Sequence, residues 1–148
     1  HNDYRQFVDY LKEGVRGCLC IKILSKREIK IRKGMILTTG DLIKSKNSVN
    51  SVFTTTNKFT AEIRIFGGNS TEIKVGYTAF MNTGTVKETI RFIKIYNKKT
   101  KEKLNIISNR VNAVVDIEFL KNYNCINIGD KFLFREGNTR GIGKIISL

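Results

Sequence analysis

The sequence predicts an all-β protein, arranged as a closed antiparallel barrel or as a sandwich. Most of the 148 residues alternate between apolar and polar with a period of two, and β-branched and aromatic residues are frequent, which favours strands over helices. The alternating segments are short, regularly spaced and separated by polar or glycine-containing turns, and no long helical pattern interrupts them. Short strands of this kind are typical of barrels and sandwiches.

The clearest strand is predicted at residues 61–66, where the odd-numbered residues are apolar and would all face one side. A turn cluster at 67–70 follows, so we expect 71–77 to run back as the hairpin partner of this strand. The same alternation predicts further strands at 86–96, 104–107, 115–119, 131–134 and 144–146, with turns at 97–103 and 122–127.

The first part of the chain carries a mixed signal. Tyr4, Phe7, Val8 and Leu11 fall at the spacing of a helix face, but the alternation in this segment also permits a strand. Residues 38–56 are rich in Ser, Asn, Thr and Lys, which indicates a linker between a smaller and a larger part.

The charge points to a polyanionic partner. The chain has 27 Lys plus Arg against 13 Asp plus Glu, a net charge of +14 and an isoelectric point near 9.9. Such an excess attracts phosphate backbones by a salt-sensitive mechanism that does not depend on base sequence. The alternative is a basic surface that serves only solubility, or Lys enrichment by codon bias, so the placement of Arg matters more than the Lys count.

The hydropathy and the first residue of the sequence lead to two further expectations. No apolar run approaches the roughly 20 residues of a membrane-spanning helix, and no charged-then-apolar leader opens the sequence. We therefore expect a cytoplasmic protein without membrane contact. Because the sequence begins at His1 rather than Met, we also expect it to be a piece of a longer protein.

Signatures of catalysis are few, and we expect no catalytic residue and no metal site in this chain. It lacks the patterns of a phosphate loop, a nucleophile elbow and a zinc-protease helix. Gly141-Ile142-Gly143 has the glycine spacing of a dinucleotide loop but precedes a short apolar strand, so a bulge or a close backbone approach explains it better. Cys18, Cys20 and Cys125 are an odd number without repeated spacing, so we expect small buried hydrophobes rather than a disulfide framework or zinc ligands.

The densest candidate for a binding site is the segment 134–144. It holds three cations and three glycines in a polar loop, which could present guanidinium groups and backbone N–H groups to phosphate oxygens. The alternative is a strand–turn–strand in which Arg135 pairs with Glu136 or another acid and the glycines occupy positive-φ positions. The residues alone leave both interpretations open.

Four groups of motifs then stand in a consistent order along nearly the whole chain. They are 13–17 with 26–29 and 33–37, KFTAEI at 58–63, Gly76-Tyr77 with Thr85 and Thr89, and Arg135-Glu136-Gly137 with Thr139 and Gly141-Ile142-Gly143. In this order they resemble the end of the second domain and the whole third domain of elongation factor Tu and elongation factor one alpha-like translational GTPases. The loop that runs straight from Gly137 to Thr139 is more similar to eukaryotic elongation-factor-like GTP-binding proteins. Ala79 and a longer linker depart from the family pattern.

The resemblance implies a domain organisation. Residues 1–39 would be the last strands of a partial second barrel, 40–56 a linker, and 57–148 a six-stranded antiparallel barrel like domain 3 of elongation factor Tu. The strands in 1–39 would have open edges. We therefore expect them to dock against the C-terminal barrel or to pair between chains.

The resemblance also implies a function and a set of contact residues. This non-catalytic fragment would belong to a GTPase whose catalytic domain lies before His1, with GTP and magnesium bound there and no cofactor here. Its partners would be tRNA or aminoacyl-tRNA, the ribosome and its own GTPase domain. The family's tRNA contacts fall on Thr89, Arg135, Glu136 and Gly137, and a further contact position is occupied by Phe80 instead of a polar residue.

We add Arg140 to this set because it would flank the same loop. Such contacts position the RNA backbone and read no base sequence. The competing hypothesis is a structural barrel that docks the GTPase domain or an exchange factor without touching RNA.

Overall fold

The computed structural model describes residues 8–22, 24, 31–32, 34–37, 54–66, 72–108 and 112–148. The chain divides into two compact units, His1–Lys30 and Ile31–Leu148. In the described residues of the first unit, 8–22 and 24, no helix or strand forms. Tyr4 and Phe7 of the predicted helix-or-strand stripe lie outside the described residues, and Val8 and Leu11 lie in neither a helix nor a strand. The assignment of 1–39 to a partial second barrel stays a prediction.

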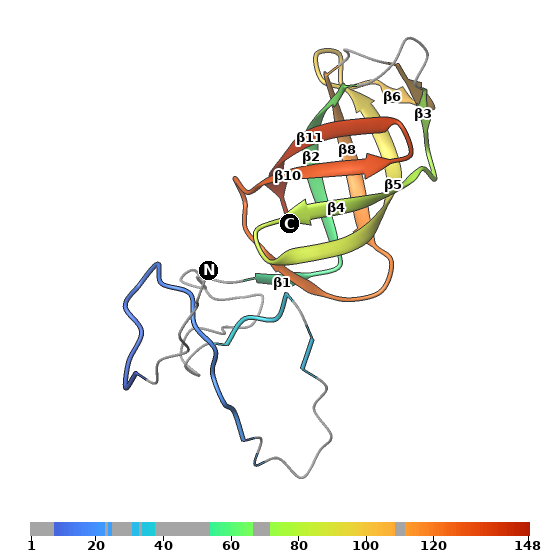
Figure 1. The fold of residues 1–148 in the computed structure, drawn as a ribbon. Helices are drawn as coiled ribbons and strands as arrows, with labels where there is room; N and C mark the ends of the chain where they lie inside the picture. Colours follow the sequence, from blue (N-terminus) through green and yellow to red (C-terminus); the bar gives the residue numbers. More distant parts are fainter. Residues whose placement is uncertain are drawn as a thin grey trace. The chain divides into compact units, whose positions relative to one another are not determined.

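In the second unit, six strands of the described residues close into an antiparallel barrel (Figure 1). Their order around the ring is β4-β10-β11-β2-β8-β5, and the pairing of β4 with β5 closes it. Their bounds are Lys58–Phe66 for β2, Thr78–Thr83 for β4, Val86–Asn97 for β5, Asn112–Phe119 for β8, Lys131–Glu136 for β10 and Thr139–Ser147 for β11. The predicted all-β, six-stranded antiparallel barrel is confirmed.

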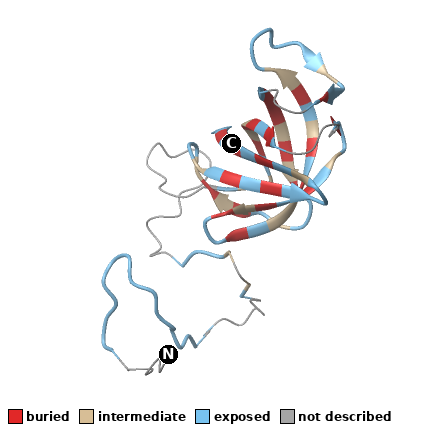
Figure 2. Cartoon of the chain, turned by 45° about the horizontal axis from the view of Figure 1, so that its top comes forward, coloured by how far each residue is buried: buried red, intermediate tan, exposed pale blue. Residues whose placement is uncertain are grey.

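The core fills the barrel because every strand of the ring turns apolar residues inward, and most of the residues between them are polar and face outward. Buried and exposed positions follow one another along the strands (Figure 2), as predicted for 61–66 and for 115–119. The Phe59 ring is tilted against Phe119 at 5.2 Å and meets Phe132 edge-on at 5.9 Å between ring centroids, and Phe92 meets Phe134 edge-on at 5.5 Å. Two of these contacts join strands that are not neighbours in the ring, β2 with β10 and β5 with β10.

Short strands extend the barrel at its ends. They are β1 at Thr54–Thr56, β3 at Ile73–Lys74, β6 at Lys103–Leu104, β7 at Ile106–Ile107 and β9 at Asn124–Ile126. The hairpin predicted around 97–103 is confirmed, since β5 pairs with β6. Of the residues predicted as a linker, 40–53 lie outside the described residues, whereas 54–56 form β1 and pair with β9.

One predicted hairpin and one predicted turn were wrong, and the turn predicted at 67–70 lies outside the described residues. Residues 71–77 are not the hairpin partner of 61–66, because the two edges of β2 are taken by β8 and β11 and β3 pairs with β7 instead. The predicted turn 122–127 contains β9. In both cases barrel closure pairs segments that are distant in sequence, and local alternation carries no information about such partners.

The closing hairpin is longer than predicted, and Gly141 and Gly143 lie inside β11 rather than in a loop. Gly141 is opposite Phe134 and Gly143 is opposite Phe132. A Cβ at either glycine would overlap the opposite ring, and at Gly141 it would also lie 2.8 Å from the backbone carbonyl oxygen of Arg64. The predicted close backbone approach is therefore found at Gly141, whereas at Gly143 the approaching group is an aromatic side chain. Neither glycine has a positive φ, in contrast to Gly137 with φ 52°.

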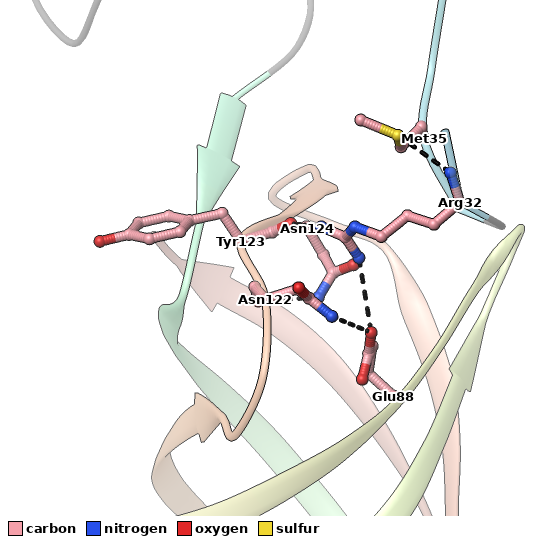
Figure 3. Close-up of polar contacts among 6 residues, drawn as sticks. All are labelled: Arg32, Met35, Glu88, Asn122, Tyr123 and Asn124. Atoms are coloured by element: carbon pink, nitrogen blue, oxygen red, sulfur yellow. Dashed lines mark hydrogen bonds and ion pairs between the residues drawn. The ribbon is translucent and has the colours of Figure 1, made fainter. Parts of the chain in front are cut away.

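Residues 31–37 belong to the same unit as the barrel and are tied to it by Arg32 (Figure 3). One guanidinium nitrogen lies 3.5 Å from a carboxylate oxygen of Glu88 on β5, and the other donates to the Tyr123 carbonyl at 2.8 Å. The Asn122 amide donates to the same Glu88 oxygen at 2.9 Å. One carboxylate therefore joins the segment before the barrel to the loop after β8.

Candidate nucleic-acid interface on the outer face of the barrel

The structure brings three of the five predicted site residues, Thr89, Arg135 and Arg140, into line with Phe80 on the outer face of the barrel. Thr89 on β5 is opposite Phe80 on β4, Phe80 is opposite Arg135 on β10, and Arg135 is opposite Arg140 on β11. Neighbouring strands lie about 4.8 Å apart, so this row spans roughly 14 Å across four strands. We call these residues the transverse row.

The two arginines of the transverse row have no counter-charge among the residues that the structure describes. Both are exposed and directly opposite each other, and like charges in that arrangement destabilise a sheet. Neither forms an ion pair with a residue that the structure describes, so the alternative in which Arg135 pairs with Glu136 finds no support among those residues. Two uncompensated guanidinium groups side by side suit an anion with several oxygens.

The predicted residues Glu136 and Gly137 lie at the β10–β11 turn, next to the row. Glu136 is opposite Thr139, so Gly137 and Asn138 form a two-residue turn. Gly137 has a positive φ and Asn138 does not, as in a type II′ turn. A Cβ on Gly137 would meet open space, so the backbone of this turn is open to approach by a ligand.

Tyr77, singled out by the Gly-Tyr motif, lies near this turn. Burial raises the pKa of its hydroxyl, the Thr139 side chain lowers it, and the Glu136 carboxylate raises it again. The Tyr77 oxygen is enclosed, and the Thr139 side chain, although near it, does not reach the geometry of a hydrogen bond. Its ring packs edge-on against Phe92 at 5.5 Å, so its part is to support the hairpin from within.

Three further cations lie on the same face, and of these only Lys144 belonged to the predicted segment 134–144. Lys131 and Lys144 are opposite each other on β10 and β11, and Arg64 is opposite Ile142. All three line a shallow hollow of about 620 Å³ beside the transverse row. Their alternation with buried residues shows that they point outward, but only the strand register places them together.

The cysteines differ in burial. Cys18 and Cys20 are exposed, so the prediction that they are small buried hydrophobes was wrong. Cys125 is half-buried in β9, and burial together with Asp130 raises the pKa of its thiol. Within the described ranges, no three of His, Cys, Asp and Glu are grouped as a metal ion would require. Those ranges also contain no helix long and apolar enough to span a membrane.

Fold and face together define a closed antiparallel β-barrel with several cations on its outer surface. The family model of the elongation factor Tu C-terminal domain matches residues 52–148. The chain therefore belongs to the elongation factor Tu C-terminal domain family and carries the C-terminal barrel of a translational GTPase family protein. This confirms the family that the motifs indicated.

Two curated relatives are similar over 118 residues. GTP-binding protein 2 of Mus musculus and of Homo sapiens are each 32% identical, over 78% of this chain and 16% of their own length. The chain thus spans about a sixth of these relatives.

Solved structures share the fold. The crystal structure of Sup35 complexed with GDP matches with a TM-score of 0.53 and 22% identity over 67% of this chain and 27% of that one. The structure complexed with GMPPNP matches with a TM-score of 0.54 and 23% identity, over 65% and 26%.

Proposed function

We propose that this barrel binds the sugar–phosphate backbone of tRNA or aminoacyl-tRNA as the non-catalytic C-terminal part of a GTP-dependent translation factor. The observation that carries the proposal is the Arg135–Arg140 pair, exposed and without an ion-pair partner among the described residues. Thr89 adds a hydroxyl at one end of the transverse row, and the open turn at Gly137 adds backbone N–H groups. Guanidinium, hydroxyl and backbone N–H groups are the usual donors to phosphate oxygens.

The rest of the protein would supply the chemistry. In this proposal GTP and magnesium bind a GTPase domain outside these 148 residues, the cytoplasmic factor works at the ribosome, and the barrel positions the RNA. The net charge of +14 supports this role because it raises the rate of encounter with any polyanion. Residues 31–37, tied to the barrel by Arg32 and Glu88, would transmit the position of the preceding part of the chain.

A second candidate function is docking of the GTPase domain or of an exchange factor, without RNA. It is favoured by the apolar side chains on the same face, since Phe80 is 39% exposed and Leu133 is 59% exposed. Exposed apolar groups of this size side by side are more typical of protein contacts than of phosphate contacts.

Titration of the whole chain with tRNA at rising salt separates these candidates. Backbone binding predicts that the logarithm of the association constant falls linearly with the logarithm of salt concentration, with a slope of about 0.9 for each phosphate neutralised. Absence of binding at low salt would contradict the proposal and favour docking.

The variant Arg140→Ala tests the site itself. It should weaken binding of all tRNAs about equally and reduce the salt slope by about one. Lys121→Ala is the matched control, because Lys121 is exposed and lies in the loop after β8, outside the transverse row. If both variants bind with the affinity and slope of the parent, this face is not the RNA site.

A further inference from the structure

The outer face of the β10–β11 hairpin has an ordered pattern of charge and apolar surface. Three cross-strand pairs point outward from it, namely Arg135 with Arg140, Leu133 with Ile142, and Lys131 with Lys144. An aliphatic pair therefore lies between two cationic pairs. We call this arrangement the hairpin face.

The aliphatic pair lies outside the barrel core. Leu133 is 59% exposed and Ile142 is 42% exposed, and both line the hollow of about 620 Å³. Arg64 is opposite Ile142 on one side and Asn82 is opposite Leu133 on the other, so polar side chains border the aliphatic pair. A small apolar centre with a polar rim is the anatomy of a protein contact site.

The rim of the hollow is strongly positive. It is lined by the cations Arg64, Lys98, Lys131 and Lys144 and by one carboxylate, Glu62. That carboxylate is already engaged, because its oxygen lies 2.7 Å from the Lys98 ammonium. The three remaining cations have no ion pair with any residue in the described part of the chain. Charge complementarity therefore calls for an acidic occupant.

RNA accounts for the cationic pairs but not for the centre of the hairpin face. Leu133 and Ile142 have no side-chain donor for a phosphate oxygen and no aromatic ring on which a base could stack. A protein segment with one apolar side chain between two carboxylates fits all three pairs.

We propose that the hairpin face binds an extended acidic segment of a protein partner, with carboxylates at residues i and i+4 and an apolar side chain at i+2. In an extended chain, side chains on one face recur every two residues, about 6.6–6.8 Å apart. The outward pairs of the β10–β11 hairpin have the same spacing, so the segment lies along the hairpin in register. This inference does not rest on RNA binding. Because Arg135 and Arg140 belong to both sites, the segment and tRNA compete.

The test uses the whole chain and two labelled synthetic peptides of the same composition. One carries the core Glu-Ser-Leu-Ser-Glu and the other the order Glu-Glu-Ser-Ser-Leu, and binding is followed by fluorescence anisotropy. The first peptide should bind at least about fivefold more tightly. This is the loss of affinity expected when one energetically important interface residue is removed. Equal affinities would overturn the proposed register.

Variants test which side chains carry the binding. Leu133→Ser should weaken the ordered peptide by about fivefold or more and leave tRNA affinity unchanged. Leu120→Ser is the matched control, because Leu120 is 38% exposed and does not line the hollow. A melting temperature like that of the parent confirms that each variant is folded. If Leu133→Ser binds the peptide as the parent does, or loses tRNA affinity to the same extent as peptide affinity, the assignment to a protein segment is wrong. The peptide titrations contain no RNA, so failure of the proposed RNA function leaves their outcome unaffected.

Discussion

Gly141→Ala should destabilise the barrel more than any outward substitution in the same strand. A Cβ at Gly141 would lie 2.8 Å from the carbonyl oxygen of Arg64 on β2 and would overlap the ring of Phe134. That carbonyl belongs to the β2–β11 ladder, and Phe134 is 1% exposed and packs against Phe92. The Arg64 carbonyl cannot move away without loss of strand pairing, and the Phe134 ring cannot move away without loss of core packing.

The magnitude follows from these two obstacles. Overpacking of a filled core costs about 1–3 kcal/mol. We expect Gly141→Ala to fall in the upper half of that range, because one obstacle is backbone. Gly143→Ala should fall in the lower half, since the three atoms nearest to its added Cβ all belong to the Phe132 ring. Lys144→Ala, outward in the same strand, is the control and should change the free energy of unfolding by no more than about 0.5 kcal/mol.

Urea unfolding followed by far-UV circular dichroism measures these differences, provided that the denaturant slopes agree among the variants. The double variant Gly141→Ala/Phe134→Leu should lose less than the sum of its single variants, by about 1 kcal/mol or more, because the smaller side chain leaves room for the added methyl group. If Gly141→Ala is as stable as the parent and the double variant is simply additive, the close approach of Phe134 to Gly141 is not a constraint on the fold.

Three more predictions follow from the contacts of single residues. Arg32→Ala removes the link to Glu88 and Tyr123 and should cost about 1–2 kcal/mol, with faster amide exchange in residues 31–37 and in the loop after β8. Tyr77→Phe removes an enclosed hydroxyl without a hydrogen-bond partner in the described chain, so its urea midpoint at pH 7 should equal or exceed that of the parent. The pKa of Tyr77 is raised above its ordinary value of 10.0, so its contribution to stability is complete below pH 10 and is lost as pH rises above it. Tyr77→Phe should therefore flatten the fall in stability above pH 10, and an unchanged fall would refute this. At pH 8, iodoacetamide should alkylate Cys125 more slowly than the two exposed cysteines, because burial and Asp130 raise the pKa of its thiol, and equal rates by mass spectrometry would contradict it.

The sequence predicted what depends on local pattern. Inward positions such as Ile63 and Ile117 follow from alternation, because a strand with one buried face must place apolar residues at every second position. The β5–β6 hairpin followed from a polar stretch between two alternating segments. The pairing of β2 with β8 and β11 did not follow, since its partners are distant in sequence and their register is set by closure of the barrel.

The candidate site shows the same division. Arg135 and Arg140 were marked by local charge density, and the family motifs added Thr89 and Gly137. Their alignment through Phe80 became visible only with the register of four strands. Lys131 and Leu133 of the hairpin face carried no motif, and Lys144 and Ile142 lay in the predicted segment 134–144 without being assigned to a surface. Outward residues of ordinary type become a surface only when strands place them side by side.

An amide chemical-shift titration of the ¹⁵N-labelled chain with tRNA at low salt locates the RNA contacts residue by residue. If the transverse row and its turn bind RNA, the shifts concentrate on Thr89, Arg135, Gly137 and Arg140, and they diminish together as salt is raised. Shifts that instead concentrate on the lysine-rich β5–β6 turn at 98–101, with the transverse row unchanged, would contradict the assignment of this face to RNA.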